Sequence, residues 1–377
     1  MKEKQKILVF IDWYVPAYKA GGPIRSVYTL VENLHKTYDF YIITSNADID
    51  GEVLANIKEN RWTRQGNANV LYLPNKEQTI KRIKQEYNKI KPNKVYLNSL
   101  FSTKFTLMPL LAFRQKSSCV VVAPRGMLGQ ESLAIKPLKK KLFLSVAKMF
   151  GLYKNVYWHA TSLQEQKEIK QVFGHKTNIK IAKNLALIPA SFNPIKKEKN
   201  KLKILMVGRI VPIKNIHFLL ETLKHIDTTY SIELTLVGPL EDTEYWDRCK
   251  NIIKDFPPHI TVKNTGAIPP IEVSKLFLSH HLLVSTSLNE NYGHSIAEAL
   301  SYGRPVVVSN YTPWKNLEKL GIGANLDLEE SLFRDKIMFF AGLDNEAFEI
   351  YQKKARNYAE KELQNQDDVI KAINVFL

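Results

Sequence analysis

The stretch from Ser285 to Ser309, STSLNENYGHSIAEALSYGRPVVVS, predicts a strand, a loop, a helix and a second strand. Residues 281–287 and 305–308 are apolar runs of strand type. Residues 295–302 have the apolar spacing of a helix, and Gly303 stands where a helix C-cap belongs. Parallel strands joined by a crossover helix lie in one sheet, so this stretch predicts an α/β fold.

Two carboxylates accompany this predicted helix. Glu290 lies just before its N-terminus and Glu298 about one turn inside it. The free N–H groups and the positive end of the helix dipole form a site for an anion such as phosphate. Carboxylates beside that site can bind the hydroxyls of a sugar and a ribose. A helix with a solvated glutamate has the same spacing, so the spacing alone leaves both interpretations open.

Short strand-like runs alternate with helical patterns through the first half of the chain, which indicates a parallel sheet with crossover helices. The expected strands are 6–11, 40–44, 70–73, 94–97, 119–123 and 156–160, and the expected helices include 23–34, 77–90, 103–114 and 137–150. Gly21 and Gly22 leave the backbone bare before the first helix, where amides can approach a phosphate. A plain tight turn explains this Gly-Gly pair equally well. Residues 48–66 are polar and predict a long excursion.

A charged, polar segment, NPIKKEKNKLK at 193–203, predicts a linker between two domains. After it a second alternating unit begins, with strands expected at 203–207, 233–237 and 260–263. Each half therefore predicts a Rossmann-type domain. The last stretch, 348–377, is helical, and its apolar positions near the end need a surface to cover, for which the first domain is the candidate.

The length of 377 residues fits two domains that each bury a core, and 45% hydrophobic residues indicate a globular protein. Cys119 and Cys249 lie far apart and near no His cluster, so neither a disulfide framework nor a zinc site is indicated, and a reducing compartment fits. We expect no membrane-spanning helix, and we interpret the N-terminus as a first strand because Asp12 interrupts its apolar run.

The charge is unevenly distributed. Residues 1–198 hold 33 Lys+Arg and 14 Asp+Glu, a net of +19, whereas the remainder has a net charge of −2. Nucleic acid, an anionic membrane or a phosphorylated substrate would complement the basic half. The predicted helix 136–150 combines Lys136, Lys139, Lys140, Lys141 and Lys148 with large apolar residues. It is either an anionic-membrane contact or a buried helix with a solvated lysine edge.

Several ordered blocks in the second half resemble family-4 retaining glycosyltransferases. They are VGRIVPIKNIHFLLETL, LVGP, NTGAIPPIEVSKLF and STSLNENYGHSIAEALSYGRPVVVS, and they cover most of 203–309. Gly21-Gly22 and ATSLQEQKEI add to the resemblance in the first half. PRGMLGQESLAIKPLKKKLF is similar to a segment of members that build bacterial surface polysaccharides. The resemblance implies a GT-B fold: α/β, with two Rossmann-like domains facing across a cleft.

The resemblance also implies roles for individual residues. Arg209 and Lys214 would bind the diphosphate of a nucleotide-sugar, Glu298 the ribose and Glu290 the donor sugar. The full set of implied donor-binding residues is Gly21, Gly22, Arg209, Lys214, Glu290, Asn291, Tyr292, Gly293 and Glu298, with Arg209, Lys214 and Glu290 as catalytic candidates. Two cations and a helix N-terminus suit a leaving diphosphate without a metal. No Asp-x-Asp stands at a strand end, so a metal site is not favoured.

The sequence departs from the family pattern in three places. Many members carry a His after the strand equivalent to 119–123, where this chain has Pro124-Arg125-Gly126. Arg125 is therefore our candidate for the acceptor or sugar side. Lys183-Asn184-Leu185 replaces the family's Pro-Asn-Gly, and Asn-Tyr-Gly follows Glu290 where Gly-Phe-Gly is frequent.

From these observations we predict an N-terminal acceptor-side domain over 1–195, a nucleotide-sugar-binding domain over 196–355, and a C-terminal helix over 356–377. The predicted activity is a retaining, metal-independent, hexosyltransferase-type transfer from a UDP- or GDP-sugar to a saccharide or lipid-linked acceptor, without a further cofactor. It would serve surface polysaccharide or lipopolysaccharide assembly, in the cytoplasm and peripherally at the inner face of the membrane. The alternatives are a nucleotide-sugar 2-epimerase and a basic nucleic-acid-binding protein. The basic residues are dispersed and no nucleic-acid module is recognised, which disfavours nucleic acid as a partner.

Overall fold

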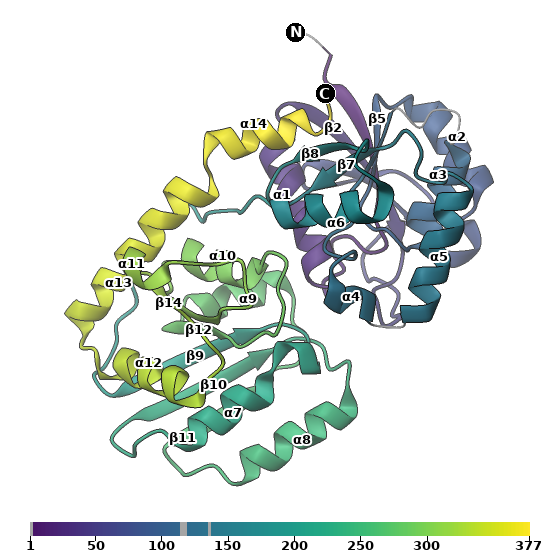
Figure 1. The fold of residues 1–377 in the computed structure, drawn as a ribbon. Helices are drawn as coiled ribbons and strands as arrows, with labels where there is room; N and C mark the ends of the chain where they lie inside the picture. Colours follow the sequence, from purple (N-terminus) through teal and green to yellow (C-terminus); the bar gives the residue numbers. More distant parts are fainter. Residues whose placement is uncertain (1–2, 114–118, 135–136) are drawn as a thin grey trace. The chain divides into compact units, whose positions relative to one another are not determined.

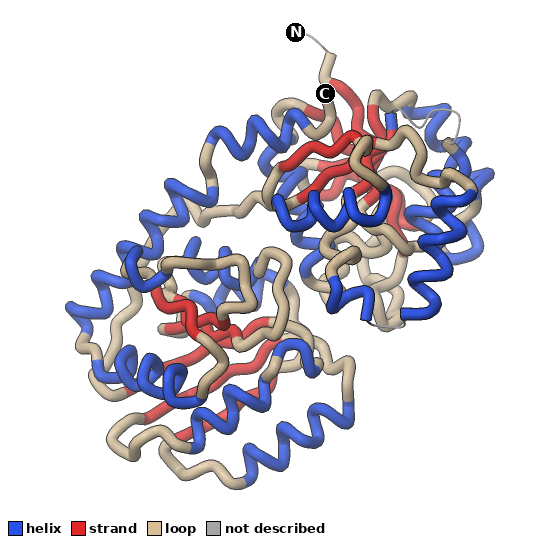
Figure 2. The backbone as a smooth tube through the Cα atoms, viewed as in Figure 1, coloured by secondary structure: helices blue, strands red, loops and turns tan. Residues whose placement is uncertain are grey.

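The computed structural model describes residues 3–113, 119–134 and 137–377 (Figures 1 and 2). The chain forms two compact units. Unit 1 is Met1–Leu185 with Gln366–Leu377, and unit 2 is Ala186–Asn365. The chain passes from unit 1 to unit 2 after Leu185, earlier than the predicted boundary at 195. It returns to unit 1 after Asn365, inside the predicted C-terminal segment 356–377, so that segment is shared between the units.

Unit 1 is built on an eight-stranded sheet, as far as its residues are described. The strand order is β3-β4-β2-β1-β5-β6-β7-β8, and every neighbouring pair is parallel except β3 with β4. The strands are β1 (Gln5–Phe10), β2 (Tyr38–Ser45), β3 (Thr63–Gln65), β4 (Ala68–Leu73), β5 (Lys94–Leu97), β6 (Val120–Val122), β7 (Tyr157–Ala160) and β8 (Asn178–Ile181). The order reverses between β1 and β5, which is where ligands bind in open α/β sheets.

The helices of unit 1 follow the predicted alternation. They are α1 (Gly22–Leu34), η1 (Asn75–Glu77), α2 (Ile80–Ile90), the π-helix η2 (Thr103–Leu107), α3 (Met108–Ala112), α4 (Gln130–Ala134), α5 (Pro137–Met149), α6 (Leu163–Phe173) and α14 (Gln366–Asn374). Ser162 caps α6, because its side chain accepts from the amide of Glu165. The Glu165 carboxylate binds the amide of Thr161 at 2.6 Å, one residue before the position that a capping box predicts.

The end of the chain returns to unit 1. Helix α14 contacts α1 and β8, and its yellow ribbon ends beside this unit in Figure 1. Phe376 is fully buried, with its ring 5.5 Å from Tyr38, 6.3 Å from Phe40 and 5.3 Å from Tyr96, all edge to face. Aromatic pairs of this geometry add to the burial energy of the rings. The last residues of the chain therefore complete a core that begins at β1.

Unit 2 is built on a six-stranded, wholly parallel sheet. Its order is β11-β10-β9-β12-β13-β14, with the reversal between β9 and β12. The strands are β9 (Lys201–Val207), β10 (Ser231–Val237), β11 (Ile260–Asn264), β12 (Leu282–Ser285), β13 (Val306–Ser309) and β14 (Gly323–Leu326). The helices are η4 (Pro212–Lys214), α7 (Ile216–Lys224), α8 (Thr243–Lys254), α9 (Pro270–Phe277), α10 (His294–Ser301), α11 (Leu317–Leu320), α12 (Glu330–Gly342), α13 (Asn345–Tyr358) and the π-helix η5 (Ala359–Leu363).

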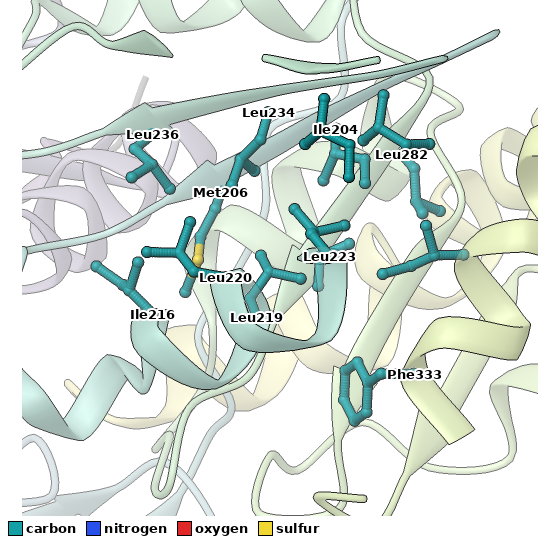
Figure 3. Close-up of a cluster of buried hydrophobic side chains, with 14 of the residues drawn as sticks. Ile204, Met206, Ile216, Leu219, Leu220, Leu223, Leu234, Leu236, Leu282 and Phe333 are labelled. Atoms are coloured by element: carbon teal, nitrogen blue, oxygen red, sulfur yellow. The ribbon is translucent and has the colours of Figure 1, made fainter. Parts of the chain in front are cut away.

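One core of unit 2 lies between this sheet and the helices α7, α8 and α12. Figure 3 shows Leu219, Leu220 and Leu223 of α7 meeting side chains of β9 and β10, with Phe333 of α12 nearby. All of these side chains are almost fully buried, and each contributes roughly 1.5–3 kcal/mol by its removal from water. This packing fixes the carboxyl ends of β9 and β10 in place.

Two α/β units with parallel sheets confirm the predicted fold class. The structure adds β3, α4, β8, α11, α12 and β14, which were not predicted. Of the residues predicted in helices, Arg114 and Lys136 lie outside the described residues.

Candidate active site

A small pocket lies at the carboxyl ends of β9, β10 and β12, at the strand-order reversal of unit 2. Its lining includes Gly208, Arg209, Lys214, Val237, Ser285 and Ser287. The structure thus brings together Arg209 and Lys214, as predicted from their positions after a strand end. Ligands of open α/β sheets bind in this location.

Two glycines allow the strand ends to approach closely. A Cβ atom at Gly238 would lie 1.9 Å from the carbonyl oxygen of Gly208, so only glycine fits there. A Cβ atom at Gly208 would lie 3.3 Å from Cε of Lys214. The bare backbone at Gly208 therefore leaves space for the lysine side chain over the strand end.

Lys214 and Glu290 form an ion pair. The ammonium Nζ lies 2.5 Å from Oε2 of Glu290, and both side chains are 19% exposed. Their backbones are held together as well. The hydroxyl of Thr286 donates to the carbonyl oxygens of Lys214 and Asn215, and the amide of Leu288 donates to Ile213. A half-buried pair with fixed backbones is a preorganised arrangement, unlike a mobile surface pair.

Arg209 differs from Lys214 in its surroundings. Its side chain is 45% exposed and its Nη1 donates to Glu241 at 2.8 Å. A guanidinium at the mouth of the pocket offers several donors in a planar fork, which matches the oxygens of a phosphate. The exposed pair with Glu241 contributes little stability, so a bound anion can replace it at low cost.

The loop before α10 is shaped by Gly293. This residue has φ +78°, and a Cβ atom there would lie 2.8 Å from Ile296 and 3.3 Å from Cγ of Glu290. Trp314 donates from Nε1 to the carbonyl oxygen of Tyr292 at 2.6 Å, which fixes the loop from its other side. Asn291 is exposed on the same loop. The loop therefore presents the N-terminal amides of α10 in a set position, as an anion site requires.

Glu298 lies in the second turn of α10 and is partly buried. Neither Glu298 nor Glu290 lines the pocket at the strand ends. Glu290 is connected to that pocket by its ion pair with Lys214, which lines it. The predicted ribose contact of Glu298 stays a prediction.

The remaining predicted residues lie in unit 1. Gly21 has φ +67° and precedes the first residue of α1, Gly22. The carboxylate of Asp48 accepts hydrogen bonds from the backbone amides of Tyr18 and Lys19 at 2.9 and 3.1 Å. These bonds hold the β1–α1 loop against the polar segment 48–66. The positive φ of Gly21 makes glycine the favoured residue at this helix start.

The side chain of Arg125 is held by hydrogen bonds inside unit 1. It donates to Asn98 at 2.8 Å, to Asn184 at 2.5 Å and to the hydroxyl of Tyr96 at 2.7 Å. These contacts fix the guanidinium as part of a buried polar network. A contact of Arg125 with the acceptor or sugar stays a prediction.

The same network contains a buried histidine, which the sequence analysis did not single out. His159 bonds through Nδ1 to the Tyr96 hydroxyl at 2.7 Å and through Nε2 to the carbonyl oxygen of Ala182 at 2.8 Å. A carbonyl only accepts, so Nε2 carries the proton and Nδ1 accepts. Burial, together with the charge of Arg125, lowers the pKa of His159 to about 3. The imidazole is therefore neutral.

Asp12, which interrupts the first apolar run of the sequence, was not among the predicted site residues. It follows β1 at the reversal between β1 and β5, and its Oδ1 accepts from the Ser102 hydroxyl at 2.6 Å. Burial raises the pKa of Asp12, although the Ser102 bond opposes the shift. The signal in the sequence is an acidic residue directly after a first strand. Among the described residues no cluster of three or more His, Cys, Asp or Glu side chains could hold a metal ion.

Comparisons with known proteins bear on the class of this protein. Residues 188–324 match the family model described as "Glycosyl transferases group 1". The whole chain has the GT-B fold, and together these findings support a GT-B glycosyltransferase.

Solved structures of similar fold cover nearly the whole chain. Sucrose-phosphate synthase from Thermosynechococcus elongatus has a TM-score of 0.73 at 15% identity, covering 99% of this chain and 98% of that one. HepE from Anabaena in complex with UDP-glucose has a TM-score of 0.67 at 17% identity, covering 98% of both chains. WaaG, a glycosyltransferase involved in lipopolysaccharide biosynthesis, has a TM-score of 0.63 at 12% identity, covering 97% and 99%. No curated protein matches the chain by sequence.

Proposed function

We propose that this protein is a retaining glycosyltransferase of family 4 that uses a UDP- or GDP-sugar. The acceptor is a saccharide, lipid-linked, in surface polysaccharide or lipopolysaccharide assembly. The observation that carries the proposal is the pocket at the β9/β12 reversal, which Arg209 and Lys214 both line and where Lys214 pairs with Glu290. Solved structures of the same fold contain UDP-glucose, in HepE, and UDP-2-fluoro glucose, in a trehalose-6-phosphate protein from E. coli.

The chemistry of the pocket suits departure of a nucleoside diphosphate. Negative charge grows on the leaving phosphate as the bond to the sugar breaks. Arg209 and Lys214 provide positive charge at that place, and the amides at the start of α10 provide further donors. These groups act without a metal ion. Glu290 orients Lys214 and offers its second oxygen to the hydroxyls of the donor sugar.

Helix α5 supports a peripheral contact with an anionic membrane. Leu138 is 83% exposed and Met149 72%, and Leu142, Val146 and Phe150 are exposed as well. Their spacing of three or four residues places them on one face of the helix. Lys139, Lys141 and Lys148 are also exposed, so apolar and cationic groups reach solvent together, as in interfacial helices.

Not every lysine of this helix serves such a contact. Lys140 turns inward, with Nζ 2.5 Å from the carbonyl oxygen of Ser132 and 5.5 Å from the ring centre of Phe101. Lys136 lies outside the described residues. None of the described helices is long and apolar enough to cross a membrane. We therefore propose the exposed face of α5 as the membrane contact, which would bring a lipid-linked acceptor to unit 1 from the inner face of the membrane.

The test is a thermal-shift panel of UDP-, GDP- and ADP-sugars with the full chain. A ligand that binds only the native state raises the melting temperature, by an amount that grows with concentration over its dissociation constant. We expect a shift with a UDP- or GDP-sugar, and we expect Arg209→Ala to reduce it. A panel without any shift, at concentrations up to several millimolar, contradicts the proposal.

A further inference from the structure

A second groove, in unit 1, is not used by the donor site. It has a volume of about 610 Å³ and lies where the excursion 48–66 meets β4 and the β1–α1 loop. Its lining includes Asn56, Lys58, Trp62, Arg64, Gln65 and Tyr72, and we call it the edge groove. Thr63, Arg64 and Gln65, which form the outermost strand β3, line the groove, so it lies along the lateral edge of the sheet and away from the reversal between β1 and β5.

The charge of the edge groove is positive. Lys58 and Arg64 line it, and none of the described lining residues is acidic. Neighbouring carboxylates are engaged elsewhere. Glu59 accepts from Asn46 at 2.7 Å, and Glu86 binds Trp62, Arg82 and Lys89. Arg64 donates from Nε to the carbonyl oxygen of Gly66 at 2.9 Å, which leaves its two terminal nitrogens for a bound anion. A guanidinium pairs with both carboxylate and phosphate oxygens.

The other lining groups suit a sugar ring. Trp62 is fixed by its Nε1 bond to Glu86 at 2.9 Å and by an edge contact with Tyr41, with ring centres 5.5 Å apart. Tyr72 is fixed by its hydroxyl, which donates to the carbonyl oxygen of Val15 at 2.5 Å. Tyr72 is only 1% exposed and belongs to the floor of the groove, whereas Trp62 is partly exposed and offers a rigid apolar surface to the C–H face of a sugar. The carboxamides of Asn56 and Gln65 can donate to hydroxyls and accept from them.

The edge groove is connected to the loop that leads to Gly21. Pro16 of that loop lines the groove, and Asp48 of the excursion holds the amides of Tyr18 and Lys19. Lys19 in turn pairs with Asp50 at 2.6 Å and with Glu52. A ligand in the groove therefore contacts a segment that is fastened to the β1–α1 loop, on the acceptor side of the proposed reaction.

From the charge, the partly exposed ring of Trp62 and the carboxamides, we infer that the edge groove binds an acidic sugar unit of the acceptor, one that bears a carboxylate or a phosphate. The inference rests on the proposed function, because it takes the acceptor to be a saccharide. It adds the class of acceptor: an anionic glycan, recognised at a subsite of unit 1 that is separate from the donor pocket of unit 2.

The experiment measures binding to the full chain by calorimetry. The probes are a tetrasaccharide of alternating glucuronic acid and N-acetylglucosamine, the neutral tetrasaccharide of N-acetylglucosamine, and glucose 6-phosphate. The variant is Lys58→Ala with Arg64→Ala. Both side chains are exposed, so the fold should persist. The control, Lys167→Ala with Lys176→Ala, removes the same charge from exposed positions of unit 1 outside the groove.

We expect an acidic probe to bind at least about tenfold more tightly than the neutral tetrasaccharide, with the advantage falling as salt rises. The groove variant should lose that advantage and the control should keep it. The better of the two acidic probes identifies the source of the charge as carboxylate or phosphate. Equal binding of acidic and neutral probes, or a groove variant that binds like the wild type, overturns the inference.

A second variant, Trp62→Phe, tests the stacking surface with less risk to the core than alanine. It should weaken both tetrasaccharides alike, because an aromatic face contacts neutral and acidic sugars equally. Nucleoside diphosphate binding is measured in parallel. If no nucleotide binds but the acidic probe still depends on Lys58 and Arg64, the proposed function fails while the glycan site stands. If nucleotides bind and the probes do not, the edge groove alone is wrong.

Discussion

Nζ of Lys214 lies 2.5 Å from Oε2 of Glu290, in a pair whose side chains are both only 19% exposed. The lysine comes from the turn after β9 and the glutamate from the loop before α10. Lys214, the proposed phosphate-side cation, and Glu290, the proposed sugar-side carboxylate, are therefore a coupled pair. Replacing either residue should alter the other, so their effects should not add.

The first prediction concerns turnover. Lys214→Ala should lower kcat by about a hundredfold, and more than it weakens donor binding, since the diphosphate gains charge only as the sugar leaves. Arg209→Ala should also lower kcat, but by less, because the arginine side chain is more exposed than that of Lys214. Steady-state kinetics with the donor found by thermal shift measures both.

The control for these variants is Lys263→Ala, which removes an exposed lysine of β11. It should leave kcat unchanged. Activity should also survive EDTA, because the two cations take the place of a metal. Full loss with chelator that Mg²⁺ or Mn²⁺ restores contradicts this mechanism.

The second prediction concerns Glu298. Glu298→Ala should weaken nucleoside diphosphate binding by about 1.5–3 kcal/mol, because a charged acceptor for the ribose hydroxyls is lost. Calorimetry with the matching diphosphate measures this change. Glu330→Ala, at an exposed position of α12, is the control and should bind normally. Unchanged affinity in a folded Glu298→Ala protein shows that the ribose lies elsewhere.

The third prediction concerns the loop before α10. Gly293→Ala places a Cβ atom 2.8 Å from Ile296 on a backbone with φ +78°. The strain should lower the stability of unit 2 by about 1–3 kcal/mol and displace Glu290. Urea unfolding and donor binding should both report it. Gly342→Ala should be tolerated, because an added Cβ atom there meets only Tyr230, at 3.7 Å.

The fourth prediction concerns α5. Liposomes that contain anionic lipid should co-sediment with the wild type, and neutral liposomes should not. Each lysine near the surface contributes roughly 1 kcal/mol, screened over a Debye length of about 8 Å. Changing Lys139, Lys141 and Lys148 to Glu should release the protein. The control changes Lys36, Lys81 and Lys84, all exposed on other elements of unit 1.

If the α5 variant sediments like the wild type, α5 is not the membrane contact. If neither protein sediments at low salt, the acceptor is soluble and the exposed apolar face has another purpose.

The fifth prediction concerns pH. The pKa of His159 is lowered from 6.5 to about 3, so the unfolded chain takes up a proton below pH 6.5 that the folded chain does not. Stability should therefore fall as the pH drops, by about 2 kcal/mol between pH 6.5 and pH 5 from this group alone. His159→Gln should remove that part of the pH dependence in urea unfolding, whatever its effect at pH 7. His175→Gln, at an exposed position, should retain the slope.

Much of the fold could be predicted because local patterns specify buried parallel strands. Strands such as β5 are short runs of apolar residues with polar residues on either side. The runs are continuous because a central strand of a parallel sheet is buried on both of its faces. β3 was missed because its three residues, TRQ, carry no apolar pattern, and its position depends on an antiparallel pairing with β4. β8 was missed for a similar reason, since its residues are at most partly buried.

The candidate site was only partly predictable. Arg209 and Lys214 both lie in the turn after β9, so their nearness follows from their closeness in the sequence. The Lys214–Glu290 pair joins two distant loops, and no local pattern fixes its distance. Arg125 shows the same limit: no local pattern indicates that Asn98, Tyr96 and Asn184, from other segments, accept hydrogen bonds from its three side-chain nitrogens.

The return of α14 to unit 1 means that unit 2 is, in topology, an insertion between Leu185 and Gln366. A protein cut after residue 185 would lack Phe376 and would open the aromatic core of Tyr38, Phe40 and Tyr96 to water. Unit 2, in contrast, is one continuous segment of the chain, 186–365, and can be excised as one piece. Unit 1 should fold alone only when a short linker joins residue 185 to 366, which makes this chain a natural candidate for domain grafting.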